Sequence, residues 1–242
     1  MEVHAHSHTA RKKWTHYFWE FLMLFLAVFC GFLAENQREH MIEHQRAKEF
    51  ASLMDEDLKK DTSFFRKGIE RFEMIEKHQD SLALILRAPF VNINRYDLVR
   101  HWINGVWALS FIPHQATYEQ MKHSGSLRYI KNIPLINSLQ DYYNNMLPNI
   151  DHYHAIQSEL TEQRVVPFLE DHISYQQADF LTSTMNTNTP EIFDWNKGTA
   201  IKLYNMMALL RDQNKSLHQF YKIALEKAGL VRQLLKKEYH LK

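Results

Sequence analysis

The chain has little of the residues that break helices or cross-link a fold. Its 242 residues include six glycines, six prolines and a single cysteine, Cys30. So few glycines and prolines favour long helices over many short strands. Because no cysteine follows Cys30, disulfides and thiolate metal sites are excluded from the rest of the chain, while the redox compartment stays open.

The sequence also lacks the short motifs of several enzyme classes. It has no Gly-rich phosphate loop, no G-x-S-x-G turn and no C-x-x-C pair. Its formal net charge is +1, so a basic surface for nucleic acid is not predicted. We therefore expect a protein that is not an enzyme, binds no cofactor and has no nucleic-acid partner.

What is present is one long apolar run. Residues 14–34 read WTHYFWEFLMLFLAVFCGFLA, with Glu20 as the only acid. At about 1.5 Å per helical residue, about 21 residues span roughly 31 Å, close to the hydrocarbon thickness of a bilayer. The run predicts a single transmembrane helix in contact with lipid, preceded by a short tail of residues 1–13.

A cleaved signal peptide is the alternative for this run, because the basic residues 11–13 precede it. Its apolar core is longer than the usual signal core of about 7–15 residues. Phe32 stands where a signal peptidase needs a small residue, and Phe29 spoils a lipoprotein box at Cys30. An uncleaved anchor is favoured.

The charges on either side of the run predict its orientation. Three cations precede it, whereas three acids (Glu35, Glu39 and Glu43) and one cation, Arg38, directly follow it. Positive charge near a membrane helix favours the cytoplasmic side. We expect the N-terminus in the cytoplasm and residues 35–242 in the periplasm, as in a single-pass inner-membrane protein.

The rest of the chain reads as helices. Residues 35–49 are polar on nearly every side and predict a helical stalk, and residues 50–242 predict a helical-bundle domain. From Phe50 to Leu86 apolar residues recur at spacings of three and four, and Ala88-Pro89 ends that helix. The expected fold class is all-α: a transmembrane helix that continues into the stalk, then an elongated antiparallel bundle.

Shorter signals divide the middle of this domain. Asn94 is an expected N-cap, and Thr117 with Gln120 fits a capping box. Gly125 is expected at the C′ position of that helix, with Ser126 capping the next.

Later signals concern the prolines and the last helix. Pro148 and Pro167 should kink or segment a helix that begins near Leu135. Residues 176–198 carry the weakest pattern, and within them residues 182–190 read as a surface loop; a last long helix is expected from Thr199. In it, residues 203, 210, 217, 224 and 231 form an apolar heptad line.

One pattern matches a metal site. His40, Glu43 and His44 form H-x-x-E-H, in which two imidazoles on one helix face hold Zn²⁺ and the glutamate activates water. The motif lies on the polar stalk, with no third ligand and no pocket wall in view. A solvated helix face is the favoured interpretation, ahead of weak metal binding and of zinc hydrolysis.

Two further groups are candidates for contacts. Trp102, Trp107, Tyr118 and Arg128 are candidates for a ligand or partner surface, although core packing is the commoner use of aromatics at helical spacing. In the membrane run, Ala27, Gly31 and Ala34 place small residues on one helix face, which suits close approach of a second helix. Glu20 is an acid that needs a partner there.

Two stretches resemble known proteins. Residues 16–40, HYFWEFLMLFLAVFCGFLAENQREH, look like the N-terminal signature of a group of uncharacterised single-pass membrane proteins of Bacteroidota. Residues 117–128, TYEQMKHSGSLR, look like a recurrent element of such proteins. The resemblance implies an inner-membrane location and says nothing about activity.

These observations favour a membrane-anchored helical protein that acts in the cell envelope as a non-enzymatic interaction, scaffold or oligomerisation module. The expected partners are a second copy of the chain or another envelope protein. A ligand sensor that signals through a partner, with the aromatic middle as its pocket, is the alternative. A metal-dependent hydrolase that uses H-x-x-E-H is a remote one.

Overall fold

A computed structural model describes residues 14–88, 93–174 and 192–241. The predicted tail of residues 1–13 and the predicted loop of residues 182–190 lie outside the described residues. The chain divides into two compact units, Met1–Glu49 and Phe50–Lys242.

The predicted all-α class is confirmed. The described residues form no β-strand, and their only strand-like pairing is an isolated bridge between Ile173 and Ile192. The α-helices are α1 Trp14–Arg87, α2 Arg95–Asn104, α3 Ala116–His123, α4 Ile133–Gln140, α5 Leu147–Leu160, α6 Val166–His172 and α7 Lys197–Tyr239. The tighter 3₁₀ turn η2 covers Ser126–Tyr129, and the wider π turns η3 and η4 cover Asp141–Met146 and Thr161–Val165.

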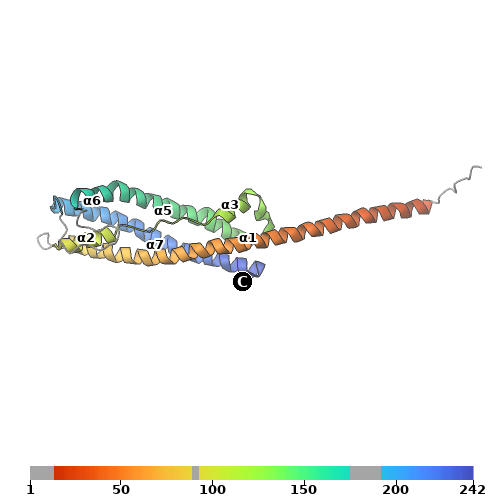
Figure 1. The fold of residues 1–242 in the computed structure, drawn as a ribbon, viewed down its shortest axis with the longest axis horizontal. Coiled ribbons are helices and arrows are strands. Elements are labelled where there is room, and N and C mark those ends of the chain that lie inside the picture. Colours follow the sequence, from red (N-terminus) through yellow and green to blue (C-terminus); the bar gives the residue numbers. More distant parts are fainter. Residues whose placement is uncertain (1–13, 89–92, 175–191, 242) are drawn as a thin grey trace, which may run out of the picture. The chain divides into compact units, whose positions relative to one another are not determined.

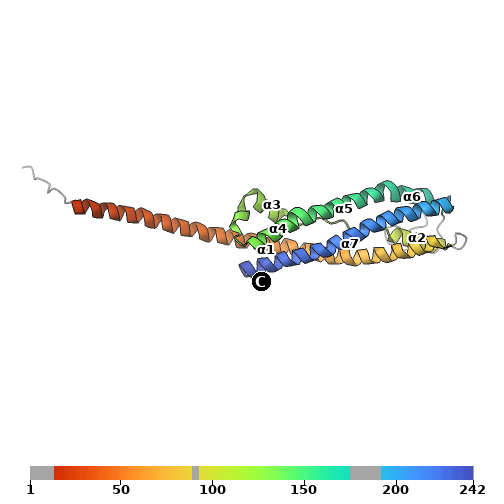
Figure 2. The same cartoon turned by 180° about the vertical axis from the view of Figure 1, so that it is seen from behind.

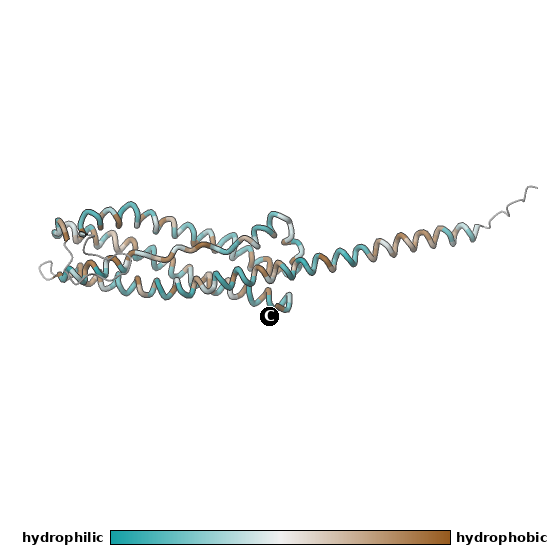
Figure 3. The backbone as a smooth tube through the Cα atoms, viewed as in Figure 1, coloured by the Kyte–Doolittle hydropathy of each residue, from teal (hydrophilic) through white to brown (hydrophobic). Residues whose placement is uncertain are grey.

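The long N-terminal helix is confirmed as well. α1 continues for 74 residues and ends at Arg87, just before Pro89, which disfavours helix for its predecessor. Near the N-terminus it contains the one stretch among the described residues that is long and apolar enough to cross a membrane. Figure 3 shows this stretch as the apolar part of the first unit.

In the second unit, α1, the line from α4 to α6, and α7 lie side by side (Figures 1 and 2). Ion pairs give the directions. Along α1, Asp55, Glu76 and Asp80 contact Arg232, His218 and Arg211 of α7, so the numbers fall on one helix as they rise on the other. Lys227 and Asn214 of α7 contact residues 141 and 157 in the same reversed order. The predicted antiparallel packing is therefore confirmed.

The bundle core follows the predicted apolar spacing. All five members of the α7 heptad line, from Leu203 to Val231, are buried. On α1 the same holds for Leu58, Phe65 and Phe72, because residues at spacings of three and four share one helix face. Leu53, which belongs to the same apolar series, differs from them, because 48% of it is exposed.

The predicted helix cap at Asn94 and the predicted helix end at Gly125 are confirmed. The side chain of Asn94 accepts hydrogen bonds from the N–H groups of Tyr96 and Asp97. Gly125 follows α3 with φ of 71°, the left-handed conformation that glycine adopts without strain. Asn196 accepts from Thr199 N at 3.0 Å, so α7 begins at Lys197, two residues before the predicted start.

Two predicted caps are wrong. α3 begins at Ala116, and the hydroxyl of Thr117 donates to Asp57 of α1 at 2.6 Å instead of closing a capping box. The Ser126 side chain caps no helix either, because its hydroxyl lies 2.8 Å from that of Ser124. In both cases a partner outside the expected cap occupies the hydroxyl.

Pro148 and Pro167 segment the middle helix as predicted. The π turn η3 immediately precedes α5, which carries Pro148 in its first turn, and η4 precedes α6 with Pro167 in the same way. A proline lacks an N–H, and its ring presses on the carbonyl four residues earlier. A wider turn relieves that contact, so the helix line continues through both prolines.

Candidate functional site

An extended segment, Gly105–Gln115, connects α2 to α3 and runs along the bundle (Figure 1). We call it the strap. The amide of Gln79 donates to Gly105 O at 2.7 Å, and Asp61 accepts from His114 N at 3.2 Å. The 18 helical residues between the two α1 anchors cover about 27 Å, and the nine extended residues between the strap anchors cover about 30 Å. The strap therefore lies along α1 in the opposite direction.

Side chains satisfy the strap carbonyls in place of a neighbouring strand. Arg71 of α1 donates to Trp107 O from Nε at 3.1 Å and from Nη2 at 2.9 Å. The hydroxyl of Tyr221 on α7 donates to Leu109 O at 3.2 Å. With Gly105 O, alternate carbonyls of the strap are bound, which is the two-residue period of an extended chain.

Asp61 is the polar centre of this arrangement. Its fully buried carboxylate accepts from His114 Nδ1 at 2.8 Å and from the Tyr142 hydroxyl at 2.7 Å. Burial raises the pKa of Asp61 above its ordinary value, although the hydrogen bonds from His114 and Tyr142 act in the opposite direction. Burial and the nearby carboxylate also raise the pKa of Tyr142, so its hydroxyl stays a donor.

The Asp61–His114 pair orients an imidazole but lacks the other parts of a nucleophilic site. With Nδ1 donating to Asp61, Nε2 is left as the proton acceptor. No serine, threonine or cysteine among the described residues hydrogen-bonds His114, although Ser63 and Lys67 line the same open hollow of about 690 Å³. The pair therefore ties the strap to α1 and does not form a catalytic triad.

Three contacts between polar side chains involve buried or partly buried histidines of the bundle. His78 and His101 lie 2.9 Å apart through their Nδ1 atoms, so one ring donates and the other accepts while both are neutral. Burial is the main cause that lowers the pKa of both, with Arg100 adding to it. The remaining two contacts are His218 Nδ1 with Glu76 at 2.7 Å and His154 Nε2 with the Tyr221 hydroxyl at 2.6 Å.

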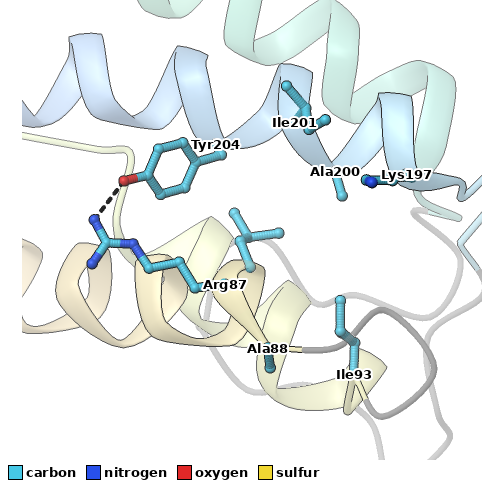
Figure 4. Close-up of a pocket in the computed structure, with 8 residues that line it drawn as sticks. Arg87, Ala88, Ile93, Lys197, Ala200, Ile201 and Tyr204 are labelled. Carbon is cyan, nitrogen blue, oxygen red and sulfur yellow. Dashed lines mark hydrogen bonds between the residues drawn. The ribbon is translucent and has the colours of Figure 1, made fainter.

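A separate cavity of about 660 Å³ lies between the end of α1 and the start of α7 (Figure 4). Arg87 donates to the Tyr204 hydroxyl at 2.7 Å, and its guanidinium carbon lies 5.5 Å from the centre of that ring. The described residues that line it are Leu86, Arg87, Ala88, Ile93, Lys197, Ala200, Ile201 and Tyr204. The cavity combines aliphatic walls with two cations.

The structure does not bring together the residues predicted as a ligand or partner surface. Trp102 is buried against Phe168 in a core cluster that includes Leu82, and Tyr118 is buried against Tyr143, with ring centres 4.3 Å apart. These two sites adjoin parts of α1 about 25 residues apart, or roughly 37 Å of helix. Trp107 and Arg128 are exposed. The aromatic middle is therefore no single pocket, and its two buried rings belong to the core.

The H-x-x-E-H residues remain on the polar face of α1. His40 Nδ1 lies 3.8 Å from Glu43 Oε2, and the side chains of His40 and His44 are exposed. Among the described residues no three His, Cys, Asp or Glu side chains are grouped so that they could hold a metal ion. The described parts of the chain thus offer no third metal ligand beside the predicted ones.

The small residues of the apolar stretch lie on one exposed face of α1. Ala27 and Ala34 are exposed, and a Cβ added at Gly31 would meet no atom within 4 Å. Glu20 pairs with His16 one turn earlier at 3.0 Å. The acid thus has a partner within its own helix, and the small-residue face is open to close approach.

Asp61 and His114 are not among the site residues predicted from the sequence. Asp61 falls three residues after Leu58 and four before Phe65, so it occupies a position of the buried α1 face. A charged residue at such a position is the signal that was available. His114 gave no local signal, because its partner lies 53 residues earlier.

No protein family, curated protein or solved structure matches this chain. The resemblance of residues 16–40 and 117–128 to a group of Bacteroidota membrane proteins therefore stays a prediction.

Proposed function

We propose that this protein is a membrane-anchored helical module that acts by binding a second copy of itself or another envelope protein, and not by catalysis. One observation carries the proposal. The apolar stretch of α1 is not buried at all in the structure, and Leu24, Val28 and Phe32 each expose about two thirds of their surface.

A membrane removes the cost of that exposure. Apolar area kept in water costs about 25 cal/mol per Å². A helix satisfies its own backbone groups, so it can enter hydrocarbon without leaving polar groups unpaired. The proposed orientation keeps the N-terminus in the cytoplasm and residues 35–242 in the periplasm, in line with the basic residues that precede the stretch.

The bundle favours a binding role over a catalytic one. Its most buried carboxylate, Asp61, is occupied by His114 and Tyr142, which join two other segments to α1. The alternative of a ligand sensor with the aromatic middle as its pocket loses support, because Trp102 and Tyr118 are core residues.

The anchor is tested by fractionating cells that express the full chain. Wild type should stay in the membrane after a carbonate wash. Leu24→Arg combined with Val28→Arg should move the protein to the soluble fraction, because each arginine at the centre of a membrane helix costs about 2.5–3.5 kcal/mol. The control is Met41→Arg, which changes an exposed residue beyond the stretch. Equal retention of both variants would refute the anchor.

Self-association is tested with the one cysteine of the chain. Cys30 is exposed and adjoins the Ala27–Gly31 face, so oxidative cross-linking in membranes reports two copies that meet there. Gly31→Leu should reduce the cross-linked dimer several-fold, because a large side chain prevents close approach. Phe25→Leu, on the opposite side of the helix, is the matched control. A dimer yield that Gly31→Leu leaves unchanged would exclude this face as the contact.

A further inference from the structure

Among the described residues that line the cavity of Figure 4, most side chains of the walls are aliphatic and all charged side chains are cations. Leu86 and Ile93 come from the end of α1 and the start of the α2 region, and Ala200 and Ile201 come from α7. All four side chains are aliphatic. Its volume of about 660 Å³ lies within the range of roughly 300–1,000 Å³ that is usual for ligand pockets.

The charged groups of the cavity are two cations. Only Nη2 of Arg87 has a hydrogen-bond partner among the described residues, the hydroxyl of Tyr204. The ammonium of Lys197 has none in the same parts of the chain, and no acid is among the described residues that line the cavity. Lys197 is also the first residue of the 43-residue helix α7, and the N-terminus of a helix carries partial positive charge.

We propose that this cavity binds a single-chain amphiphile with an anionic head group. The aliphatic walls take the hydrocarbon body, and Arg87 and Lys197 take the carboxylate or phosphate head. The Arg87–Tyr204 contact holds the guanidinium in place before the ligand arrives, which lowers the ordering cost of binding. The proposal stands independently of the membrane-anchor function, because every residue that carries it lies in the bundle unit.

A smaller space next to the cavity sets a limit on the ligand. Leu86 and Tyr204 line both, and the smaller space has a volume of about 30 Å³, which holds about one water molecule. Gln79, also in its lining, is 2% exposed, and its Oε1 atom has no hydrogen-bond partner among the described residues. A space of this size is too small for an alkyl chain, so the body of the ligand ends in the larger cavity.

The test is photo-labelling of the full chain in lipid nanodiscs. The probe is an undecyl carboxylate with a terminal diazirine, and the matched probe carries a trimethylammonium head. After irradiation, mass spectrometry locates the labelled residues. The carboxylate probe should label peptides that contain Leu86 or Ile201, and unlabelled dodecanoate or dodecyl phosphate should displace it. Octanoate should compete far less well, because each buried methylene contributes roughly a fourfold gain in affinity.

Variants separate the cavity from general lipid binding. Lys197→Glu should lower labelling of these peptides about tenfold, because an attractive charge becomes a repulsive one. Lys202→Glu is the control, since Lys202 is exposed on the same helix and does not line the cavity. Circular dichroism should show both variants folded. Equal labelling by the two head groups, labelling confined to residues 14–34, or no loss in Lys197→Glu would each overturn the proposal.

Discussion

Tyr142 donates a hydrogen bond to Asp61 at 2.7 Å, and neither side chain is exposed to solvent. The same carboxylate accepts two hydrogen bonds from His114, so η3, the strap and α1 meet at one buried charge. A buried carboxylate is tolerated when donors surround it and becomes costly when one of them is removed. The hydrogen bonds to Asp61 therefore hold η3 and the strap against α1.

Removing the tyrosine hydroxyl should destabilise the bundle. Tyr142→Phe leaves one buried oxygen of Asp61 without its donor, and a hydrogen bond to a charged group contributes about 1.5–3 kcal/mol. Urea unfolding of the full chain in detergent, followed by circular dichroism, should show a loss of that size. Tyr129→Phe is the matched control, because Tyr129 is only partly buried and should change the free energy of unfolding by less than about 0.5 kcal/mol. Equal effects of the two variants would contradict the role of the Asp61 centre.

Two glycines should respond oppositely to the same substitution. A Cβ at Gly68 on α1 would overlap the ring of Tyr221, which is buried and bonded to His154 and the strap. Gly68→Ala should cost about 1–3 kcal/mol through overpacking, more than the helix propensity that it gains. A Cβ at Gly229 on α7 would meet no atom within 4 Å, so Gly229→Ala should stabilise by up to about 1 kcal/mol. Thermal unfolding of both variants decides, and stabilisation by Gly68→Ala would show that the two helices are not packed this closely.

Removing the arginine that holds the strap should loosen the strap before the helices. Arg71→Ala deletes both hydrogen bonds to Trp107 O, and hydrogen–deuterium exchange of residues 105–112 should accelerate at least several-fold. Exchange in α5 and α7 should change much less, because their backbone hydrogen bonds lie within the helices. Arg66→Ala, at an exposed residue that forms no hydrogen bond or ion pair among the described residues, is the control. Unchanged exchange in the strap would mean that Arg71 does not hold it.

Acid should weaken the bundle through His78 and His101. Both have a folded-state pKa below the ordinary value, so their contribution to stability is complete above about pH 6.5 and is lost as the pH falls through that value toward the folded-state pKa. Each proton taken up on unfolding lowers stability by at most about 1.4 kcal/mol per pH unit, and solvent screening of these partly exposed rings reduces this. The urea concentration at the unfolding midpoint should therefore decrease as the pH is lowered from 7.5 to 5.5.

A histidine variant isolates this contribution from those of other groups. The raised pKa of Asp61 acts in the opposite direction. Its carboxyl group binds a proton more tightly in the folded state than in the unfolded state, so its contribution to stability rises as the pH falls. His101→Gln should therefore flatten the pH dependence relative to wild type, whereas His152→Gln, at an exposed histidine, should leave it unchanged. The same pH dependence in wild type and His101→Gln would exclude the pair as its source.

The candidate cavity could not be predicted from the sequence. Arg87 ends a helix and Lys197 begins another, and each looks like an ordinary solvated cation by itself. Their placement around one cavity depends on contacts between residues more than a hundred positions apart, such as Arg87 with Tyr204. The burial of Trp102 and Tyr118 has a related reason: spacing places each residue on a helix face, but only the neighbouring segments decide that this face is part of the core.

The sequence by itself determined the helices. Apolar spacing, the cap at Asn94, the turn at Gly125 and the prolines at 148 and 167 act through atoms within a few residues, so each can be recognised locally. Only the tertiary structure decided where Thr117, Asp61 and the strap carbonyls find their partners. Those partners lie between 26 and 112 residues away along the chain, and burial requires each polar group to be paired there. The local signals therefore determined which residues are helical, and the pairing of buried polar groups determined how the helices and the strap are joined.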